Sequence, residues 1–343
     1  MIYKEFLRQK VIPYVFSKIP FSILGKLTRT NLIIPYYHMV SNNNIIHVKH
    51  LYRYKNIKQF NEDLDFLLRK FSPISLYDIM DFLKSNHSFF DNTFLLTFDD
   101  GFKEMHDIVA PILLKKGISA TFFINSDFID NKKLCYQHKV SILVEHFQNN
   151  LPLVSIKKAN EIFSKNNIKV NDIRSGILSI KYHEKQIIDE IAQLWGIDFD
   201  SYLLGEKPYL TSDQINKLIK DGFTIGAHSI DHPLYSSLSL KEQLNQTETS
   251  VRFIRERFCL DYGAFAFPHN DNNVSRKFFE EIYNSGLIDV SFGTSDMRND
   301  TFKNNVQRIS LEKPFLSAER IISLQCAKKL FRVVKSSNKI IRE

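Results

Sequence analysis

Short apolar runs alternate with amphipathic stretches along most of the chain. The apolar runs have the length of buried strands. They are residues 33–37, 93–98, 120–124, 223–227, 264–267 and 288–292. In the stretches between them, apolar residues recur every three or four positions, which predicts helices. These helices are expected at residues 57–71, 75–84, 105–116, 211–221, 240–258 and 274–285. Ser75 with Asp78 is typical of a helix start, and Gly117 is typical of a helix end.

The order of these elements indicates an α/β fold. A repeated strand–helix order favours parallel strands with crossover helices, and this many repeats suit a closed (β/α) barrel better than an open sheet. Residues 131–208 interrupt the order with helical segments and no strand, so we interpret them as a helical insertion. We therefore predict a barrel over residues 32–318, a basic amphipathic segment at 1–31 and a basic helix or tail at 319–343.

The charge is concentrated at the two ends of the chain. The 343 residues carry a net charge of +8, with 43% hydrophobic and 24% charged residues, which is an ordinary globular balance and excludes a disordered chain. Six basic residues and one acidic residue lie in 1–31, and seven basic residues and one acidic residue lie in 320–343. The body between them is therefore slightly acidic, and we expect no nucleic-acid surface across it.

The basic ends lie beside apolar residues, which favours contact with an anionic membrane surface; solvated tails are the alternative. No run approaches the ~18 apolar residues that a membrane span needs. Pro13 interrupts the longest N-terminal apolar run, so the sequence does not have the pattern of a signal peptide. We expect a short interfacial helix there, or packing against the body. From the basic ends and the lack of a signal-peptide pattern, we expect a cytoplasmic protein at the inner face of the membrane. Export by another route is the rival interpretation.

Polar residues follow several of the predicted strands directly. In α/β barrels the working residues sit at the carboxyl ends of the strands, so these side chains are expected to meet at one mouth. They are His38, Asp99, Asp100, His228, His232, His269 and Asp296.

His228 and His232 are spaced for one face of a helical turn, close enough to share an ion. Two surface histidines often have this spacing by chance, but a strand-end carboxylate such as Asp100 strengthens the interpretation. Two histidines and one carboxylate form a catalytic zinc set with an open position for water. We expect one divalent cation, Zn²⁺ before Co²⁺, Ni²⁺ or Mn²⁺.

Asp99 and Asp100 are adjacent, and consecutive side chains on an extended backbone point in opposite directions. One carboxylate could then bind the metal while the other acts as general base, as metal-assisted hydrolysis requires. Gly101 allows a tight exit from the strand. An ordinary Asp-Asp-Gly turn is the alternative.

These segments resemble the motifs of the NodB-type polysaccharide deacetylases, which form family four of the carbohydrate esterases. Residues 97–101, Thr-Phe-Asp-Asp-Gly, and residues 228–232, His-Ser-Ile-Asp-His, are similar to the first two motifs. Residues 264–268, Ala-Phe-Ala-Phe-Pro, resemble the third. Residues 37–40, Tyr-His-Met-Val, resemble the YHxV element of one branch. The similarity covers residues 33–125 and 209–310.

The resemblance implies a deformed (β/α) barrel and a role for each matching residue. Asp99 corresponds to the catalytic base, and Asp100, His228 and His232 correspond to the metal ligands. His38 corresponds to the general acid, and the backbone N–H of His269 corresponds to the donor that holds the oxyanion. Arg308 resembles a late arginine that orients the base.

The chain departs from the family pattern at three places. Ala266 stands where many relatives have arginine, and His269 stands where they have tyrosine. A backbone donor survives a change of side chain, so His269 does not by itself imply lost activity. The fourth motif has no clear match. The single tryptophan, Trp195, lies in the insertion, where we interpret it as a core residue.

The resemblance implies a metal-dependent hydrolase that removes acetyl groups from N-acetylated sugars of a polysaccharide or its lipid-linked precursor. Two alternatives stay open. One is a weakly active or inactive barrel that binds glycan, and the other is an amidase that acts on a small non-sugar amide. The intact set of five residues, Asp99, Asp100, His228, His232 and His38, favours an enzyme.

Overall fold

A computed structural model of the chain describes residues 19, 21–28, 30–85, 92–148 and 152–343. The interfacial helix expected from the N-terminal sequence falls largely on residues 1–18 and lies outside these described residues. Within them, every helix is too short or too polar to cross a bilayer.

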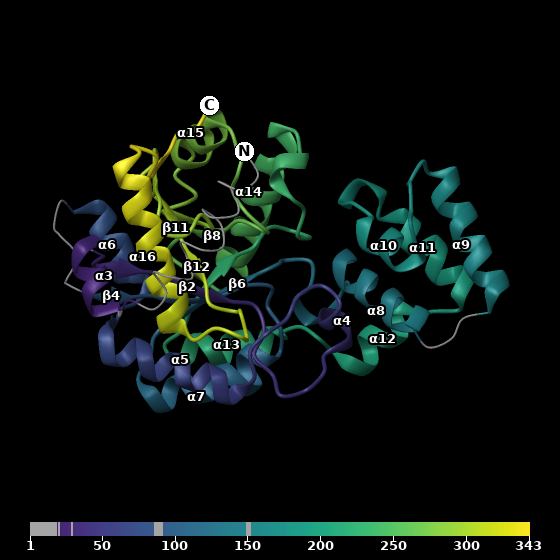
Figure 1. Cartoon of the computed structure of the whole chain (residues 1–343), viewed down its shortest axis with the longest axis horizontal. Coiled ribbons are helices and arrows are strands. Elements are labelled where there is room, and N and C mark those ends of the chain that lie inside the picture. Colours follow the sequence, from purple (N-terminus) through teal and green to yellow (C-terminus); the bar gives the residue numbers. More distant parts are fainter. Residues whose placement is uncertain (1–18, 20, 29, 86–91, 149–151) are drawn as a thin grey trace.

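The centre of the molecule is a parallel sheet that curves into a nearly closed barrel (Figure 1). Among the described residues it has eight strands in the order β11-β9-β8-β7-β6-β5-β2-β12. Their bounds are β2 Pro35–Tyr37, β5 Leu96–Phe98, β6 Ala120–Ile124, β7 Thr224–Ala227, β8 Ala264–Ala266, β9 Val290–Gly293, β11 Asn305–Gln307 and β12 Ile309–Ser310. The expected α/β barrel is therefore confirmed. Six of these strands lie on the predicted apolar runs, whereas β11 and β12 were not predicted.

One extended segment closes the barrel. β11 pairs with β9 and β12 pairs with β2, and the two strands are separated by a single residue, Arg308. The N–H of Arg308 donates to the Gly293 carbonyl at 3.1 Å, and the N–H of Ile309 donates to the Ile34 carbonyl at 2.9 Å. The segment therefore changes partner at Arg308, which places that side chain at the seam.

Helices cover the outside of the sheet and bury their apolar faces against it. They are α5 Ile57–Lys70, α6 Leu76–Lys84, α7 Ala110–Lys116, α13 Ser212–Lys220, α14 Leu240–Arg257, α15 Arg276–Asn284 and α16 Ala318–Val334. Ser75 and Asp78 form the expected capping box at the start of α6. Gly117 ends α7 in the left-handed conformation, with φ 64°. One difference is local: the predicted helix 105–116 begins with a π-helical turn, Met105–Val109.

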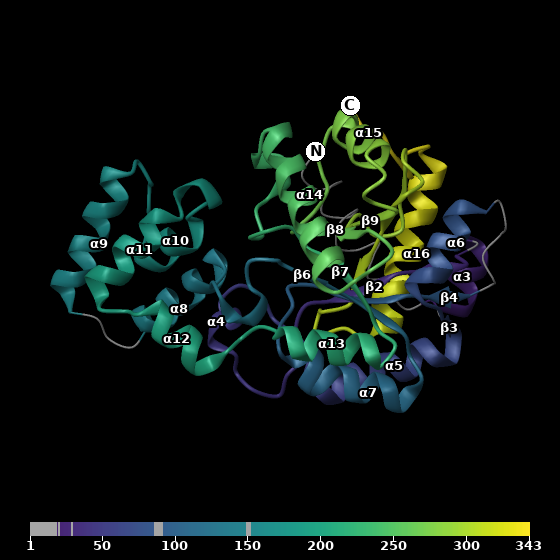
Figure 2. The ribbon, with the colours of Figure 1, turned by 180° about the vertical axis from the view of Figure 1, so that it is seen from behind.

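The residues between 131 and 208 form a body of helices beside the barrel (Figures 1 and 2). The described helices there are α8 Tyr136–Gln148, α9 Leu153–Lys165, α10 Ile173–Ser179, α11 Gln186–Trp195 and α12 Phe199–Glu206. They share an apolar core that also takes in Met39, Val48 and Phe102 from barrel loops. Trp195 is buried in this core, as expected.

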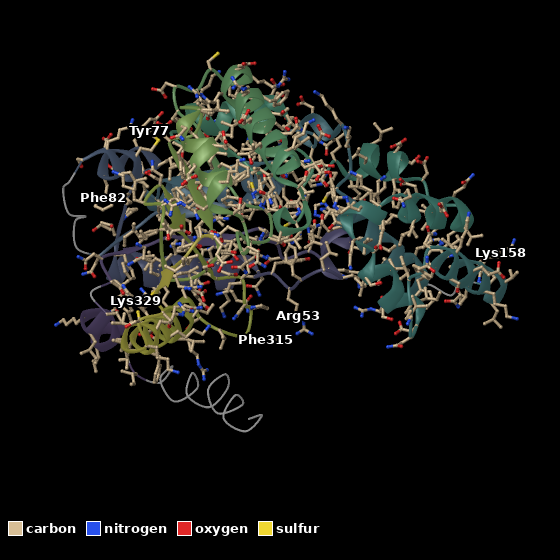
Figure 3. All side chains as sticks on the ribbon, turned by 90° about the horizontal axis from the view of Figure 1, so that it is seen from above. Arg53, Tyr77, Phe82, Lys158, Phe315 and Lys329 are labelled. Atoms are coloured by element: carbon tan, nitrogen blue, oxygen red, sulfur yellow. The ribbon has the colours of Figure 1, made fainter. Side chains whose placement is uncertain are left out.

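The C-terminal residues are tied to the barrel. α16 packs against α3 (Phe21–Thr28) and α5. β13 (Lys339–Ile340) pairs with β10 (Asn299–Asp300), and the buried Arg342 guanidinium forms ion pairs with Asp271 and Asp300. The loop before α5 contacts the segment that leads into α16. The Arg53 guanidinium lies over the Phe315 ring, 5.1 Å from the ring centroid (Figure 3). The exact division of the chain at residues 31 and 318 stays a prediction.

Candidate active site

The predicted site residues gather where neighbouring strands end. β5 ends at Phe98 and leads into Asp99 and Asp100, while β7 ends at Ala227 and leads into His228. Both strands pair in parallel with β6, so their carboxyl ends lie at the same edge of the barrel. The structure thus brings the first two motifs together at this edge, 128 residues apart in sequence for Asp100 and His228.

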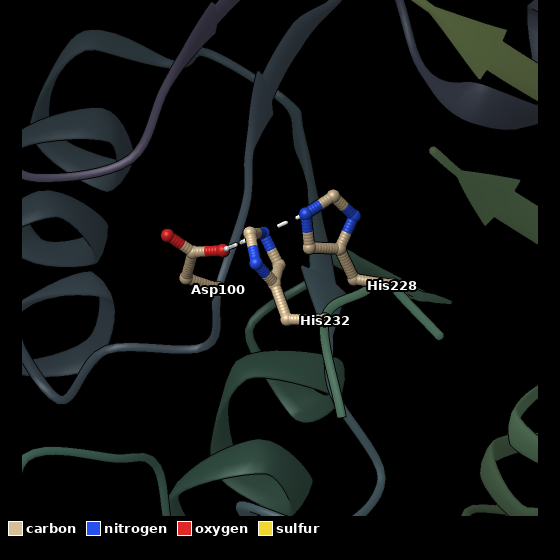
Figure 4. Close-up of side chains that lie close together, drawn as sticks. All are labelled: Asp100, His228 and His232. Carbon is tan, nitrogen blue, oxygen red and sulfur yellow. Dashed lines mark ion pairs between the residues drawn. The ribbon is translucent and has the colours of Figure 1, made fainter. Parts of the chain in front are cut away.

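Asp100, His228 and His232 form a compact triad (Figure 4). Oδ1 of Asp100 lies 3.2 Å from Nε2 of His232 and 3.5 Å from Nε2 of His228. One ligand atom from each residue lies within 4.8 Å of the others. A single ion could therefore contact all three side chains.

The backbone that presents the two histidines differs from the expected helical turn. Residues 228–232 are a loop in which Ser229 and His232 have positive φ angles of 70° and 66°. The N–H of His232 donates to Ser229 Oγ at 3.0 Å, and the Asn125 amide donates to the His228 carbonyl. These bonds offset the cost of two left-handed residues, on the order of 1–3 kcal/mol each. The imidazole centroids lie 5.1 Å apart. The two rings are therefore as close as predicted, but a loop rather than a helical turn brings them together.

Three buried polar atoms of the triad are arranged to hold a cation. Asp100 Oδ1, His228 Nε2 and His232 Nε2 lack a hydrogen-bond partner among the described residues, and they face one another. An unpaired buried polar atom costs about 1–3 kcal/mol, and three together are uncommon without a ligand. Two imidazole nitrogens and a carboxylate oxygen are a donor set for zinc and related divalent cations. The residues therefore fit the metal that the resemblance implies.

The protonation states of His228 and Asp100 suit metal binding. Burial lowers the pKa of His228 to about 4, so this imidazole is neutral near pH 7. Burial opposes ionisation of Asp100, but His232 and the other nearby histidines hold the pKa of its carboxyl well below the usual range. A neutral imidazole and a carboxylate are the forms that bind metals.

Asp99 is paired with Arg308 rather than with the histidines of the triad. The guanidinium donates from Nη1 to Oδ1 at 2.7 Å and from Nη2 to Oδ2 at 2.8 Å, and both side chains are buried. Burial raises the pKa of Asp99, but Arg308 more than offsets this and keeps it lowered. The two aspartates diverge as expected, although Asp100 does so through a left-handed backbone, with φ 74°, rather than an extended one.

Gly101 permits this sharp turn. Its φ is +69°, and a Cβ at this position would lie 2.8 Å from Cγ2 of Ile124. The position therefore requires glycine for both its conformation and its space.

His38 reaches the same region from the end of β2 and is held by Glu312. Nδ1 of His38 lies 2.5 Å from Oε2 of Glu312, and the N–H groups of His38 and Met39 donate to Oε1 at 2.5 and 2.9 Å. Burial lowers the pKa of His38, but the Glu312 carboxylate outweighs burial and raises it to about 10. His38 is therefore a cation near neutral pH, with a proton available for transfer.

Tyr52 packs beside His38, with ring centroids 5.3 Å apart. Its hydroxyl is buried and has no hydrogen-bond partner among the described residues. Burial and then the Asp100 charge raise its pKa, so the hydroxyl stays protonated and can donate. An unpaired donor next to His38 suggests a group that meets a substrate.

His269 also belongs to the site. Its ring centroid lies 4.7 Å from that of His232, and its φ is 57°. The side chain of Gln137, from α8 of the insertion, contacts both rings: its Nε2 is 2.9 Å from Nε2 of His269, and its Oε1 is 3.3 Å from Nδ1 of His232. Asp296, in contrast, turns away to Lys328 and Arg332 of α16.

The sequence analysis missed four contributors: Glu312, Gln137, Asn125 and Tyr52. For two of them, the sequence contains a pattern that could have identified them. Asn125 directly follows β6, and Glu312 lies two residues after the end of β12, so the strand-end rule includes both. Gln137 lies near the start of a helix in the insertion, and Tyr52 lies in a loop. No motif or periodicity marks either residue.

Comparison with known proteins agrees with this geometry. The family model described as "Polysaccharide deacetylase" matches residues 88–282, which is more than half of the chain. No curated protein matches the chain significantly.

Solved structures show the same fold. The Streptococcus pyogenes deacetylase PplD, in complex with acetate, matches with a TM-score of 0.55 at 14% identity, covering 86% of this chain and 98% of that one. IcaB from Ammonifex degensii matches with a TM-score of 0.52 at 14% identity, covering 86% and 97%. A polysaccharide deacetylase from Bacillus cereus matches with a TM-score of 0.51 at 12% identity, covering 86% and 69%.

The matched residues 88–282 contain Asp99, Asp100, His228, His232 and His269, which the fold gathers at one edge of the barrel. His38, Arg308 and Glu312 come from outside the matched region and complete the same site. Membership of the branch with the YHxV element stays a prediction. The matched sequence and the barrel together show that this chain belongs to the polysaccharide deacetylase family, whose members are hydrolases.

Proposed function

We propose that this protein removes acetyl groups from N-acetylated sugars of a polysaccharide, or of its lipid-linked precursor, with the help of one divalent cation. The observation that carries the proposal is the convergence of three buried atoms, from Asp100, His228 and His232, that form no hydrogen bond among the described residues. Zinc is the first candidate, because two imidazoles and a carboxylate suit it.

Asp100, His228 and His232 would hold the cation. When bound, a divalent cation supplies Lewis acidity: it polarises the acetyl carbonyl and lowers the pKa of the attacking water. All remaining roles belong to side chains and backbone groups of this chain.

Asp99 is assigned as the general base. Arg308 keeps its carboxylate ionised and fixed in place through two hydrogen bonds. A carboxylate has about four acceptor sites, so two stay available to accept the proton of the attacking water.

His38 is assigned as the general acid. Breaking the amide bond releases an amine, and a sugar amide anion leaves very poorly unless a proton reaches its nitrogen. His38 carries such a proton because Glu312 raises its pKa. The reaction then balances: water adds to the acetyl carbon, Asp99 takes a proton from it, and His38 gives a proton to the departing nitrogen, releasing acetate and a free amine.

Two further groups face the substrate in this proposal. The backbone N–H of His269 is assigned to the oxyanion of the tetrahedral intermediate, where one donor contributes about 2.7–4 kcal/mol in well-studied hydrolases. The Tyr52 hydroxyl, unpaired among the described residues, is assigned to a polar atom of the sugar.

Acetate release tests the function directly. The purified protein is incubated with N-acetylated oligosaccharides, lipid-linked N-acetyl sugars, O-acetylated sugars and small non-sugar amides, with and without a chelator. We expect acetate from the N-acetylated sugars, loss of activity with the chelator and recovery with Zn²⁺. Turnover of the small amides alone would favour the amidase alternative, and metal binding without any turnover would favour a glycan-binding barrel.

We also propose that the protein works in the cytoplasm at the inner face of the membrane. Ile23 and Leu27 of α3 are 52% and 63% exposed beside Lys26, and α3 packs against the basic helix α16. Each basic residue close to an anionic bilayer contributes about 1 kcal/mol, so attachment would be weak and salt-sensitive. Cell fractionation at low and high salt tests this, and protein found outside the cytoplasmic membrane would contradict it.

A further inference from the structure

A side chain of the helical insertion, Gln137, reaches the metal triad. This residue lies near the start of α8, and its amide contacts three partners. Oε1 lies 3.3 Å from Nδ1 of His232 and accepts a hydrogen bond from Cys135 Sγ at 2.8 Å, while Nε2 lies 2.9 Å from Nε2 of His269. The insertion therefore touches one metal ligand and the residue assigned to the oxyanion.

Each histidine ligand depends on a partner at its other ring nitrogen. A neutral imidazole can offer Nε2 to a metal only if its proton is on Nδ1, and a proton there needs an acceptor. For His228 the acceptor is the Ala266 carbonyl, at 2.8 Å. For His232 the acceptor is Oε1 of Gln137. The barrel backbone thus orients one ligand, and a side chain of the insertion orients the other.

The direction of the Gln137 amide follows from metal binding. With Oε1 toward His232, the proton is on Nδ1 and Nε2 is free for a cation. The reverse orientation would present the Gln137 NH₂ group to Nδ1 and leave the proton on Nε2, where it blocks coordination. In the metal-binding orientation, the NH₂ group donates to Nε2 of His269 and fixes that ring as well.

The start of α8 is well anchored, so Gln137 is held in place. The N–H of Cys135 donates to the Tyr209 hydroxyl at 3.0 Å, and that hydroxyl lies 2.5 Å from Nδ1 of His138. Further along α8, Ser141 Oγ donates to the Ile46 carbonyl at 2.5 Å. Bonds on both sides of Gln137 therefore tie the helix to the barrel loops.

We propose that Gln137 is a positioning residue of the metal centre and that the helical insertion is therefore part of the catalytic unit rather than an accessory body. The inference rests on the proposed metal site. Gln137 fixes the tautomer and the ring orientation of His232, and it couples His269 to the same amide. Partners of this kind typically change metal affinity by 10–100-fold when they are removed.

The test measures the affinity for Zn²⁺ by competition with a chelator of known affinity. Gln137→Met keeps the side-chain volume and removes the acceptor, so we expect 10–100-fold weaker zinc binding. Gln137→Glu keeps an acceptor oxygen at the same place and should bind zinc at least as tightly as wild type. Gln148→Ala, at the exposed end of the same helix, is the matched control and should leave zinc affinity unchanged.

Thermal unfolding of the metal-free proteins separates positioning from folding. If Gln137→Met unfolds at the wild-type temperature but binds zinc more weakly, the positioning role stands. Wild-type zinc affinity in Gln137→Met would overturn it, as would a failure of Gln137→Glu to recover affinity in a folded protein. If wild type itself binds no zinc, the proposed function fails, which is a different outcome from a failure confined to Gln137.

Discussion

The barrel edge and the helical insertion build the same site by different means. The barrel places its residues at strand ends, where parallel pairing and bonds to backbone acceptors, such as that from His228 Nδ1 to the Ala266 carbonyl, fix them. The insertion packs around a second apolar core and sends in Gln137. A contact made by backbone tolerates changes of side chain, whereas a contact made by one side chain can be lost by one substitution. The barrel is therefore expected to carry the chemistry, and the insertion to adjust it.

The strongest test of this division is Asp100→Ala. It removes the carboxylate of the triad, and we expect zinc content to fall from about one ion per chain to near zero, with turnover lost. Metal analysis of both proteins after dialysis checks the first effect, and acetate release checks the second. Equal metal content in the two proteins would show that the triad is not the metal site.

The Asp99→Asn variant tests the assigned general base independently of metal binding. Zinc should stay bound while turnover falls on the order of 10²–10⁴-fold, because the amide cannot accept the proton. The change also leaves the Arg308 charge buried without its partner, which costs about 3–5 kcal/mol of unfolding free energy. Chemical denaturation measures this cost, and adding Arg308→Met should restore part of it. A variant with wild-type stability would show that the pair is not coupled as the distances indicate.

The Glu312→Gln variant tests whether Glu312 raises the pKa of His38, the residue assigned as general acid. Glu312 raises the pKa of His38 to about 10 against the opposing effect of burial, so activity that needs protonated His38 falls as the pH rises through this value. The variant should shift the basic fall of kcat/KM to lower pH, toward the ordinary histidine value of about 6.5. A bound cation lowers the His38 pKa in both proteins, so the comparison between them is the measurement.

The same substitution has a predictable effect on stability. Because the folded pKa of His38 is raised, the His38–Glu312 pair stabilises the fold fully below about pH 6.5, and this contribution is lost as the pH rises toward 10. The wild-type advantage over Glu312→Gln should therefore shrink between these pH values. An unchanged pH profile and an unchanged stability difference would contradict the assignment of His38.

The smallest expected effect comes from Tyr52, in the segment that connects β2 to α5. Tyr52→Phe removes a buried hydroxyl that has no partner among the described residues, so the metal-free protein should be as stable as wild type or more stable, by up to about 1–3 kcal/mol. If the hydroxyl binds substrate, kcat/KM should fall by about 2–10-fold with zinc affinity unchanged. Unaltered kinetics with N-acetylated substrate would remove Tyr52 from the proposed site.

The success of prediction from sequence differed between the same two regions. The sequence predicted that four residues would meet, because apolar runs mark strand ends and parallel pairing brings those ends together. They are Asp99, Asp100, His228 and His232. The helical turn at 228–232 was wrong, since residue spacing does not distinguish a turn of helix from a loop with two left-handed residues.

Gln137 could not have been predicted from its sequence position. Its role depends on how α8 docks against the barrel, which involves bonds such as those from Cys135 to Tyr209 and from Ser141 to Ile46. Local periodicity predicts that the segment is a helix, but it carries no information on which residue of that helix faces a site formed by residues almost 100 positions later. The same reason applies to Tyr52.

The position of Arg308, between the two strands that close the barrel, matters while the chain is being synthesised on the ribosome. Arg308 follows its partner Asp99 by 209 residues. At a synthesis rate of 5–20 residues per second, the nascent chain carries Asp99 for roughly 10–40 s before Arg308 exists. During that time the barrel lacks its last strand and the Asp99 carboxylate lacks its counter-charge. We therefore expect a nascent chain that has not yet reached Arg308 to lack hydrolytic activity.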